Sequence, residues 1–170
     1  MTLFDRLVRL GLPVVPKFVV GRVARRYVAG ETVADAVRTI RNLAGEGAIA
    51  TVDVLGEEVR EAERAQAAVQ EYQRLLDIIA TEELPANISI KPTMLGLKIS
   101  EELARQTVSQ VVASAAVHDN FVRIDMEDRT CTDGTLRIYR QMLAEHAHVG
   151  VVLQSYMRRT LADIDQLLPL

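Results

Sequence analysis

Short apolar segments alternate with longer amphipathic segments along most of the chain. Four short segments are rich in aliphatic and β-branched residues, namely 48–54, 87–93, 120–128 and 148–154. Each is followed by a stretch with helical spacing of apolar residues, and the repeating unit of roughly 30 residues is typical of strand–helix–strand motifs. We therefore expect four parallel strands that alternate with helices.

This pattern predicts an α/β fold. An eight-stranded barrel usually takes about 250 residues, so 170 residues with four units indicate a partial (β/α)8 barrel of about four β/α units, preceded by N-terminal helices. We expect the helices in residues 1–46 and the first half of the barrel in residues 47–170. The alternative is a small open parallel sheet.

Capping patterns give the expected helix boundaries. Thr32 and Asp35 resemble a capping box at the start of a helix that ends by Gly45 or Gly47. The next helix is expected from Gly56 to about Ala80, with one apolar stripe. Caps for the later helices are expected at Ser100, Thr132 and Thr160, the last of them in a box with Asp163.

Residues 3–28 read as two short, basic, amphipathic helices, broken by the prolines within residues 11–16. One interpretation is a surface helix that rests on anionic lipid. The other is that these helices pack over the body of the same protein.

The net charge of −3 combines a basic segment, residues 1–30, with an acidic remainder, which argues against nucleic acid as a partner. Cys131 is the only cysteine, so no intrachain disulfide can form. No run of about 18 apolar residues offers a membrane span. We expect a cytoplasmic protein with possible peripheral membrane contact through residues 1–30.

Polar residues end the four predicted strands: Asp53, Lys91 with Thr93, Asp125 and Gln154. Lys91 follows an apolar run, which directs it into the mouth of a barrel. There it would bind a substrate carboxylate as a cation, act as a Schiff-base nucleophile, or extend into water.

Asp125 ends the next strand, so we expect it to lie beside Lys91, close enough for the two side chains to pair. It would orient a substrate amine, position a partner or act as an acid or base; a structural ion pair with Lys91 or Arg123 is the alternative. Gln154 carries one amide donor and one carbonyl acceptor, which suits the edge of a flat heterocycle and hints at a cofactor.

Other polar groups give weaker signals. Arg158 and Arg159 would contact phosphate or begin a surface helix. The three histidines, His118, His146 and His148, fall at helix-to-strand turns at the opposite end of the strands, so no metal site is expected. A dinucleotide-binding glycine fingerprint is absent.

Four motifs together resemble a known family. They are ATVDVLGE at 50–57, SIKPTMLGL at 89–97, VRIDME at 122–127 and GVVLQSYMRR at 150–159. In this order and spacing they resemble bacterial monofunctional proline dehydrogenase, from about Val23 onward. The basic N-terminal helices also look like the extra helices of that family.

The resemblance implies a distorted β/α barrel that binds FAD non-covalently, oxidises L-proline to 1-pyrroline-5-carboxylate and passes the electrons to membrane quinone. By similarity, Lys91 would bind the proline carboxylate and Asp125 would be the active-site aspartate. Met126 and Gln154 would contact the flavin, and Tyr156 would line the site.

The sequence departs from the family pattern after the fourth unit. The family's Arg-x-x-Lys-Gly-Ala-Tyr strand and its late Arg-Arg helix have no counterpart in the 170 residues, so half of the family's site and doubtful activity of the chain alone are expected. The alternative function is a non-catalytic half-barrel module that assembles through open sheet edges. A lysine Schiff-base aldolase is a third hypothesis.

Overall fold

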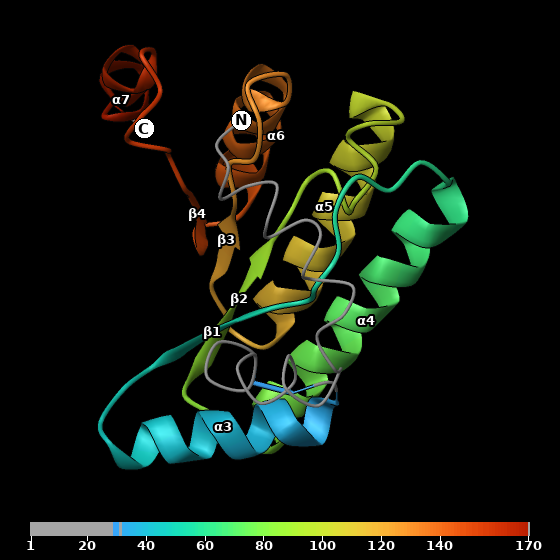
Figure 1. Cartoon of the computed structure of the whole chain (residues 1–170), viewed down its shortest axis with the longest axis vertical. Helices are drawn as coiled ribbons and strands as arrows, with labels where there is room; N and C mark the ends of the chain where they lie inside the picture. Colours follow the sequence, from blue (N-terminus) through green and yellow to red (C-terminus); the bar gives the residue numbers. More distant parts are fainter. Residues whose placement is uncertain (1–28, 31, 170) are drawn as a thin grey trace, which may run out of the picture.

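A computed structural model describes residues 29–30 and 32–169 of the chain, so the predicted helices within residues 3–28 lie outside the described residues. From α3 onward, strands and helices alternate (Figure 1). The elements are α3 (Val33–Gly45), β1 (Ala50–Asp53), α4 (Ala62–Thr81), β2 (Ala86–Ile90), α5 (Glu101–Val117), β3 (Val122–Ile124), α6 (Thr132–Glu145), β4 (Val149–Val151) and α7 (Thr160–Leu167).

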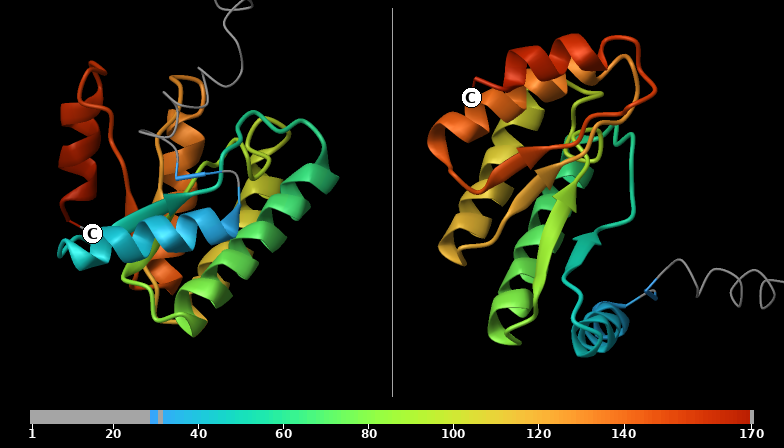
Figure 2. Two further views of the ribbon diagram at one scale, coloured as in Figure 1. Left: turned by 60° about the horizontal axis from the view of Figure 1, so that its bottom comes forward. Right: turned by 90° about the vertical axis from the view of Figure 1, so that its left-hand side faces the viewer.

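The four strands form one parallel sheet in the order β1-β2-β3-β4. Consecutive strands are therefore neighbours, and each connection passes through a helix. Helices α4, α5 and α6 lie along one side of the sheet, and α3 lies across the end at which the strands begin (Figures 1 and 2). This winding in one direction confirms the α/β prediction of about four β/α units of a barrel.

The two faces of the sheet differ in polarity. Ile88, Val122 and Ile124 are fully buried in the core that the helices cover. The alternate residues form a polar face, because successive side chains of a strand point to opposite sides. On this face Arg123 Nη1 donates to Thr51 Oγ1 at 2.8 Å, and Thr51 Oγ1 donates to Asn87 Oδ1 at 2.8 Å.

Two predicted helix starts are confirmed. Thr32 and Asp35 form a reciprocal capping box at α3, in which Thr32 Oγ1 accepts from the Asp35 amide at 3.2 Å. Ser100 Oγ caps α5 by accepting from the Leu103 amide at 3.1 Å. Each side-chain acceptor satisfies a backbone donor that has no partner within its helix.

Other predicted boundaries were wrong. All four strands are shorter than their apolar segments, and α4 begins at Ala62 rather than Gly56. The preceding loop instead bonds to the loop after β2: the Glu58 amide donates to Thr93 Oγ1 at 3.0 Å and the Val59 amide to Thr93 O at 3.1 Å. These bonds engage the Glu58 and Val59 amides outside any helix, and α4 begins only after them.

Thr132 and Thr160 do not cap α6 and α7, contrary to the prediction. Each is the first helical residue, after Cys131 and Arg159 respectively. Their hydroxyls donate to carbonyl oxygens of the preceding loop instead of accepting from helix amides. No helix among the described residues combines the length and the apolarity that crossing a bilayer requires.

Candidate active site

The polar residues predicted at the strand ends gather at one edge of the sheet. Asp53 is the last residue of β1, Lys91 follows β2 and Asp125 follows β3. Because Ile90 is in register with Ile124, Lys91 and Asp125 occupy neighbouring positions on adjacent strands. The structure therefore brings together residues that the chain separates by more than thirty positions.

Lys91 does not take Asp125 as its partner, although the sequence places the two within reach of each other. Its Nζ donates to Asp53 Oδ2, and the side chains of the two residues are 22% and 28% exposed. Asp53 is in register with Ser89, two residues before Lys91, so the long lysine side chain reaches back toward β1. The result is a partly buried ion pair between the first two strands.

A tyrosine from α4 supports this ion pair. Tyr72 is fully buried, and its hydroxyl donates to Asp53 Oδ1 at 3.4 Å. Burial is the main reason that the pKa of Tyr72 is raised, and the nearby Asp53 carboxylate raises this pKa further. The hydroxyl therefore remains a donor, and Asp53 is held from one side by Tyr72 and from the other by Lys91.

Asp125 has a different partner. Ser89 Oγ donates to its Oδ1 at 2.6 Å, which fixes the carboxylate above the strand. The second oxygen, Oδ2, accepts no hydrogen bond from the described residues. An oriented carboxylate with one available oxygen is suited to accept a hydrogen bond from a ligand amine.

Gln154 presents its carboxamide in a defined orientation. Nε2 donates to Met126 O at 2.6 Å and to Glu127 O at 2.8 Å, which uses both amide hydrogens. Two backbone carbonyl acceptors identify the nitrogen end of the amide. The carbonyl oxygen Oε1 then remains as an acceptor, without a donor among the described residues.

Met126 lies in the loop after β3. Met126 is 5% exposed, and its backbone carbonyl accepts a hydrogen bond from Gln154 Nε2. The loop is thus tied to the loop after β4. Any contact of Met126 with a cofactor stays a prediction.

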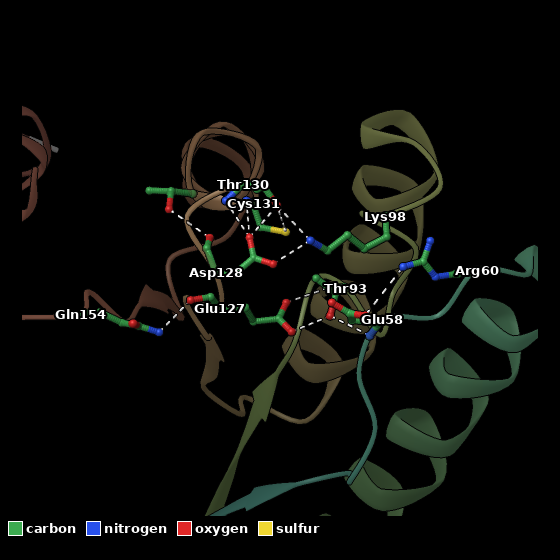
Figure 3. Close-up of polar contacts among 10 residues, drawn as sticks. Glu58, Arg60, Thr93, Lys98, Glu127, Asp128, Thr130, Cys131 and Gln154 are labelled. Atoms are coloured by element: carbon green, nitrogen blue, oxygen red, sulfur yellow. Dashed lines mark hydrogen bonds and ion pairs between the residues drawn. The ribbon is translucent and has the colours of Figure 1, made fainter. Parts of the chain in front are cut away.

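Glu127 and Thr93 join two of the site loops (Figure 3). The Glu127 carboxylate accepts from the Thr93 amide at 2.8 Å and from the Thr93 hydroxyl. Burial raises the pKa of Glu127 above its usual value, although both Thr93 hydrogen bonds act in the opposite direction. Glu127 lies in the VRIDME motif, but nothing in the sequence indicated that Thr93 is its partner.

Asp128 organises the start of α6. Its Oδ1 accepts from the Thr130 amide at 2.6 Å and from the Cys131 amide at 3.2 Å (Figure 3). Its Oδ2 accepts from Lys98 Nζ at 2.7 Å. The Lys98 bond is the main reason that the pKa of Asp128 lies below its usual value. Asp128 therefore holds the turn that leads into α6, while α6 itself has no side-chain cap.

Arg159 is not available to a phosphate group in this arrangement. It pairs with Asp133 of α6 at 2.7 Å and with Asp163 of α7 at 2.8 Å. Both carboxylates raise its pKa, with Asp163 first. Tyr156, which the resemblance places along the site, is 80% exposed.

Comparison with known proteins agrees with these motifs. The sequence model of the family described as "Proline dehydrogenase" matches residues 36–170. The chain belongs to the proline dehydrogenase family. This finding confirms the resemblance that the four strand-end motifs indicated.

Relatives within the proline dehydrogenase family cover most of this chain. It is 38% identical over 144 residues to Proline dehydrogenase 1 of Bacillus subtilis subsp. natto, covering 85% of this chain and 48% of that protein. It is 30% identical over 154 residues to Proline dehydrogenase of Deinococcus radiodurans, covering 86% of this chain and 50% of that protein. The chain spans about half the length of these curated relatives.

Solved structures show the same fold. Proline utilization A from Bdellovibrio bacteriovorus, inactivated by N-propargylglycine, aligns with a TM-score of 0.76 at 22% identity, over 82% of this chain and 18% of that one. A variant of proline utilization A from Bradyrhizobium japonicum aligns with a TM-score of 0.67 at 25% identity, over 95% of this chain and 19% of that one. The four β/α units therefore occur within known members of this fold.

Three site residues carry roles that the sequence did not reveal. Asp53 and Thr93 were recognised as polar strand-end groups but not as partners of Lys91 and Glu127. Tyr72 belonged to the apolar stripe of the predicted helix, which gave no sign of its bond to Asp53. In the proline dehydrogenase family member described here, these three residues connect the predicted site to its scaffold.

Proposed function

We propose that this chain supplies the Lys91, Asp125 and Gln154 side of a site that oxidises L-proline to 1-pyrroline-5-carboxylate with FAD. The observation that carries the proposal is the arrangement at one sheet edge of a cation, an oriented carboxylate and an amide carbonyl without a donor among the described residues, in a chain of the proline dehydrogenase family. Electrons would pass on to a quinone.

The charges at this edge suit an amino acid. Lys91 carries three ammonium hydrogens, so a bond to Asp53 leaves donors for a substrate carboxylate. Asp125 Oδ2 is the complementary acceptor for the ring amine of proline. Because Lys91 and Asp125 occupy neighbouring positions on adjacent strands, this edge offers one cation and one carboxylate to the two charges of a small zwitterion.

The residues also fit FAD. The flavin ring system carries both N–H and carbonyl groups at its edge, and Gln154 Oε1 is an acceptor that the described residues leave free. Met126 lies in the loop to which this amide is anchored. When bound, FAD supplies a two-electron acceptor beside the substrate.

The reaction removes a hydride equivalent from the ring carbon next to nitrogen and a proton from the nitrogen itself. Asp125 orients the N–H of the ring amine, and Ser89 keeps the carboxylate in place through its Oδ1. Lys91 holds the substrate carboxylate and so fixes which ring carbon faces the acceptor. The protein's own contribution is therefore orientation and charge complementarity.

Flavin binding to the purified full chain tests this proposal. The wild-type protein, mixed with FAD and freed of excess by gel filtration, should retain the flavin absorbance, and L-proline should bleach it under anaerobic conditions while D-proline does not. Q154L should weaken FAD binding, whereas Q106L, an exposed α5 amide bonded to Glu102, is the matched control. A wild-type chain that retains no flavin would overturn the proposal.

A second candidate is an assembly module, because the described sheet ends at β1 and β4. Ile49, next to β1, is 75% exposed, and open strand edges pair readily with other chains. Light scattering over a range of concentrations would detect self-association through these edges.

Membrane contact through residues 1–30 is a separate proposal, tested by vesicle binding before and after their deletion.

A further inference from the structure

A continuous chain of hydrogen bonds links the loops that carry the proposed site. It begins at Thr93, which is 1% exposed and lies in the loop between β2 and α5. Thr93 Oγ1 accepts from the Glu58 amide at 3.0 Å, and Thr93 O accepts from the Val59 amide at 3.1 Å. The loops after β1 and β2 are thereby joined.

Glu127 extends the chain in both directions (Figure 3). Its carboxylate accepts from the amide and hydroxyl of Thr93, and its backbone carbonyl accepts from Gln154 Nε2 at 2.8 Å. Gln154 O then accepts from Thr160 Oγ1 at 2.6 Å, at the start of α7. One series of bonds therefore crosses all four strand-to-helix loops.

Two features of this series cost folding free energy. Glu58 adopts a φ of +52°, a left-handed conformation that side chains other than glycine rarely take. Glu127 is a carboxylate of reduced solvent access whose pKa is raised by burial. Strained backbone and desolvated charge persist where the surrounding structure fixes them, and they cluster at functional sites.

We propose that Thr93 and Glu127 are positioning residues, which together fix the direction of Gln154 Oε1 and the place of Lys91. Thr93 lies two residues after Lys91, and Glu127 holds one of the two carbonyls that orient the Gln154 amide. Neither residue need touch the ligand. The inference rests on the proposed function, since Gln154 and Lys91 are the groups through which FAD and proline would bind.

The experiment compares T93V, T93S and T107V in the full chain. T93V removes the hydroxyl that accepts from Glu58 and donates to Glu127, while T93S restores it. T107V is the matched control, because Thr107 is also 1% exposed and its hydroxyl bonds to backbone carbonyls of Leu95 and α5, outside this series. E127Q tests the second residue, since an amide keeps one acceptor but loses the other.

Two readouts separate positioning from folding. Hydrogen exchange of the Glu58 and Val59 amides, measured without FAD, should accelerate about tenfold in T93V but not in T93S or T107V. The dissociation constant of FAD, measured by fluorescence quenching, should rise about tenfold in T93V and E127Q. T93S should remain close to wild type in both measurements.

The possible failures are distinguishable. An unchanged FAD dissociation constant in T93V and E127Q would overturn the positioning role, even if hydrogen exchange accelerates. An equal loss of affinity in T107V would also overturn it, because the effect would then follow from general destabilisation. A wild-type chain that binds no FAD would instead overturn the proposed function, and the positioning role with it.

Discussion

The two ends of the parallel sheet use polar residues in different ways. Where the strands begin, polar groups form separate pairs: His118 with Asp77 at 2.9 Å and His148 with Asp119 at 3.6 Å. Where the strands end, hydrogen bonds run from loop to loop across the sheet and leave Gln154 Oε1 without a described donor. An unpaired acceptor alone does not separate the two ends, because Asn120 Oδ1, beside the start of β2, is also buried without a donor among the described residues. The end where the strands finish differs in placing the charged groups of Lys91 and Asp125 on neighbouring strands.

The difference follows from the direction of the strands. In parallel β/α folds the loops after the strands meet at one end, where functional groups collect, while the opposite end serves stability. The histidines lie at that opposite end, as the sequence predicted. Substitutions at the two ends should therefore have effects of different kinds.

Replacing Lys91 should have the largest effect on activity. K91M removes the ammonium that would bind the substrate carboxylate, so kcat/KM for L-proline should fall about a hundredfold, because hydrogen bonds to charged groups are among the strongest. FAD affinity should change little. K98M is the matched control, since Lys98 pairs with Asp128 away from Lys91. Equal losses in the two variants would contradict a specific role for Lys91.

Replacing Asp53 should strengthen carboxylate binding, whereas replacing Lys91 weakens it. The Asp53 carboxylate competes with a substrate carboxylate for Lys91. D53N should tighten the binding of a simple carboxylate competitor about fivefold, a range that fits a partly exposed ion pair. Y72F keeps the Asp53 charge and removes only the 3.4 Å bond, so its effect should be smaller. Weaker competitor binding in D53N would instead mean that Asp53 holds Lys91 in its productive position.

Sequence pattern predicted the neighbours on adjacent strands but not the pairs that they form. The strand–helix period was enough to place Lys91 beside Asp125, because parallel strands align at their ends. Which carboxylate receives the lysine depends on register and on the direction of a long side chain. Those follow from tertiary packing, which set the Lys91–Asp53 and Ser89–Asp125 bonds.

The helix caps show a similar limit. Thr32 and Thr160 are each followed three residues later by an aspartate, yet only Thr32 caps its helix. Thr160 is the first residue of α7 rather than its cap, and its hydroxyl donates to Gln154 O instead of accepting from a helix amide. A local motif predicted the residue type, and a contact from another loop decided its role.

The pH dependence of stability should reveal the buried carboxylate of the binding edge. The pKa of Glu127 is raised above 4.5 by burial, opposed by Thr93 and Lys91 and assisted by Glu57. The folded state therefore binds the proton more tightly than the unfolded state, so this contribution to stability is present below pH 4.5 and is lost as pH rises through the raised pKa.

Urea unfolding of wild type and E127Q, from about pH 4.5 to about pH 7, measures this effect. The free energy of unfolding of wild type minus that of E127Q should decrease as pH rises, because the glutamine does not titrate. A difference that grows with pH would show that the hydrogen bonds from Thr93 outweigh the cost of burial.

The smallest expected effect is a difference in unfolding free energy between substitutions of two buried threonines in α5 and α6. Thr135 Oγ1 is buried without a partner among the described residues, whereas Thr107 Oγ1 donates to Leu95 O at 2.6 Å. T135V should leave stability unchanged or raise it by about 0.5 kcal/mol, because it removes an unpaired polar group. T107V should lower it by about 1 kcal/mol. If urea unfolding showed T135V to be as destabilising as T107V, the Thr135 hydroxyl would have a partner beyond the described residues.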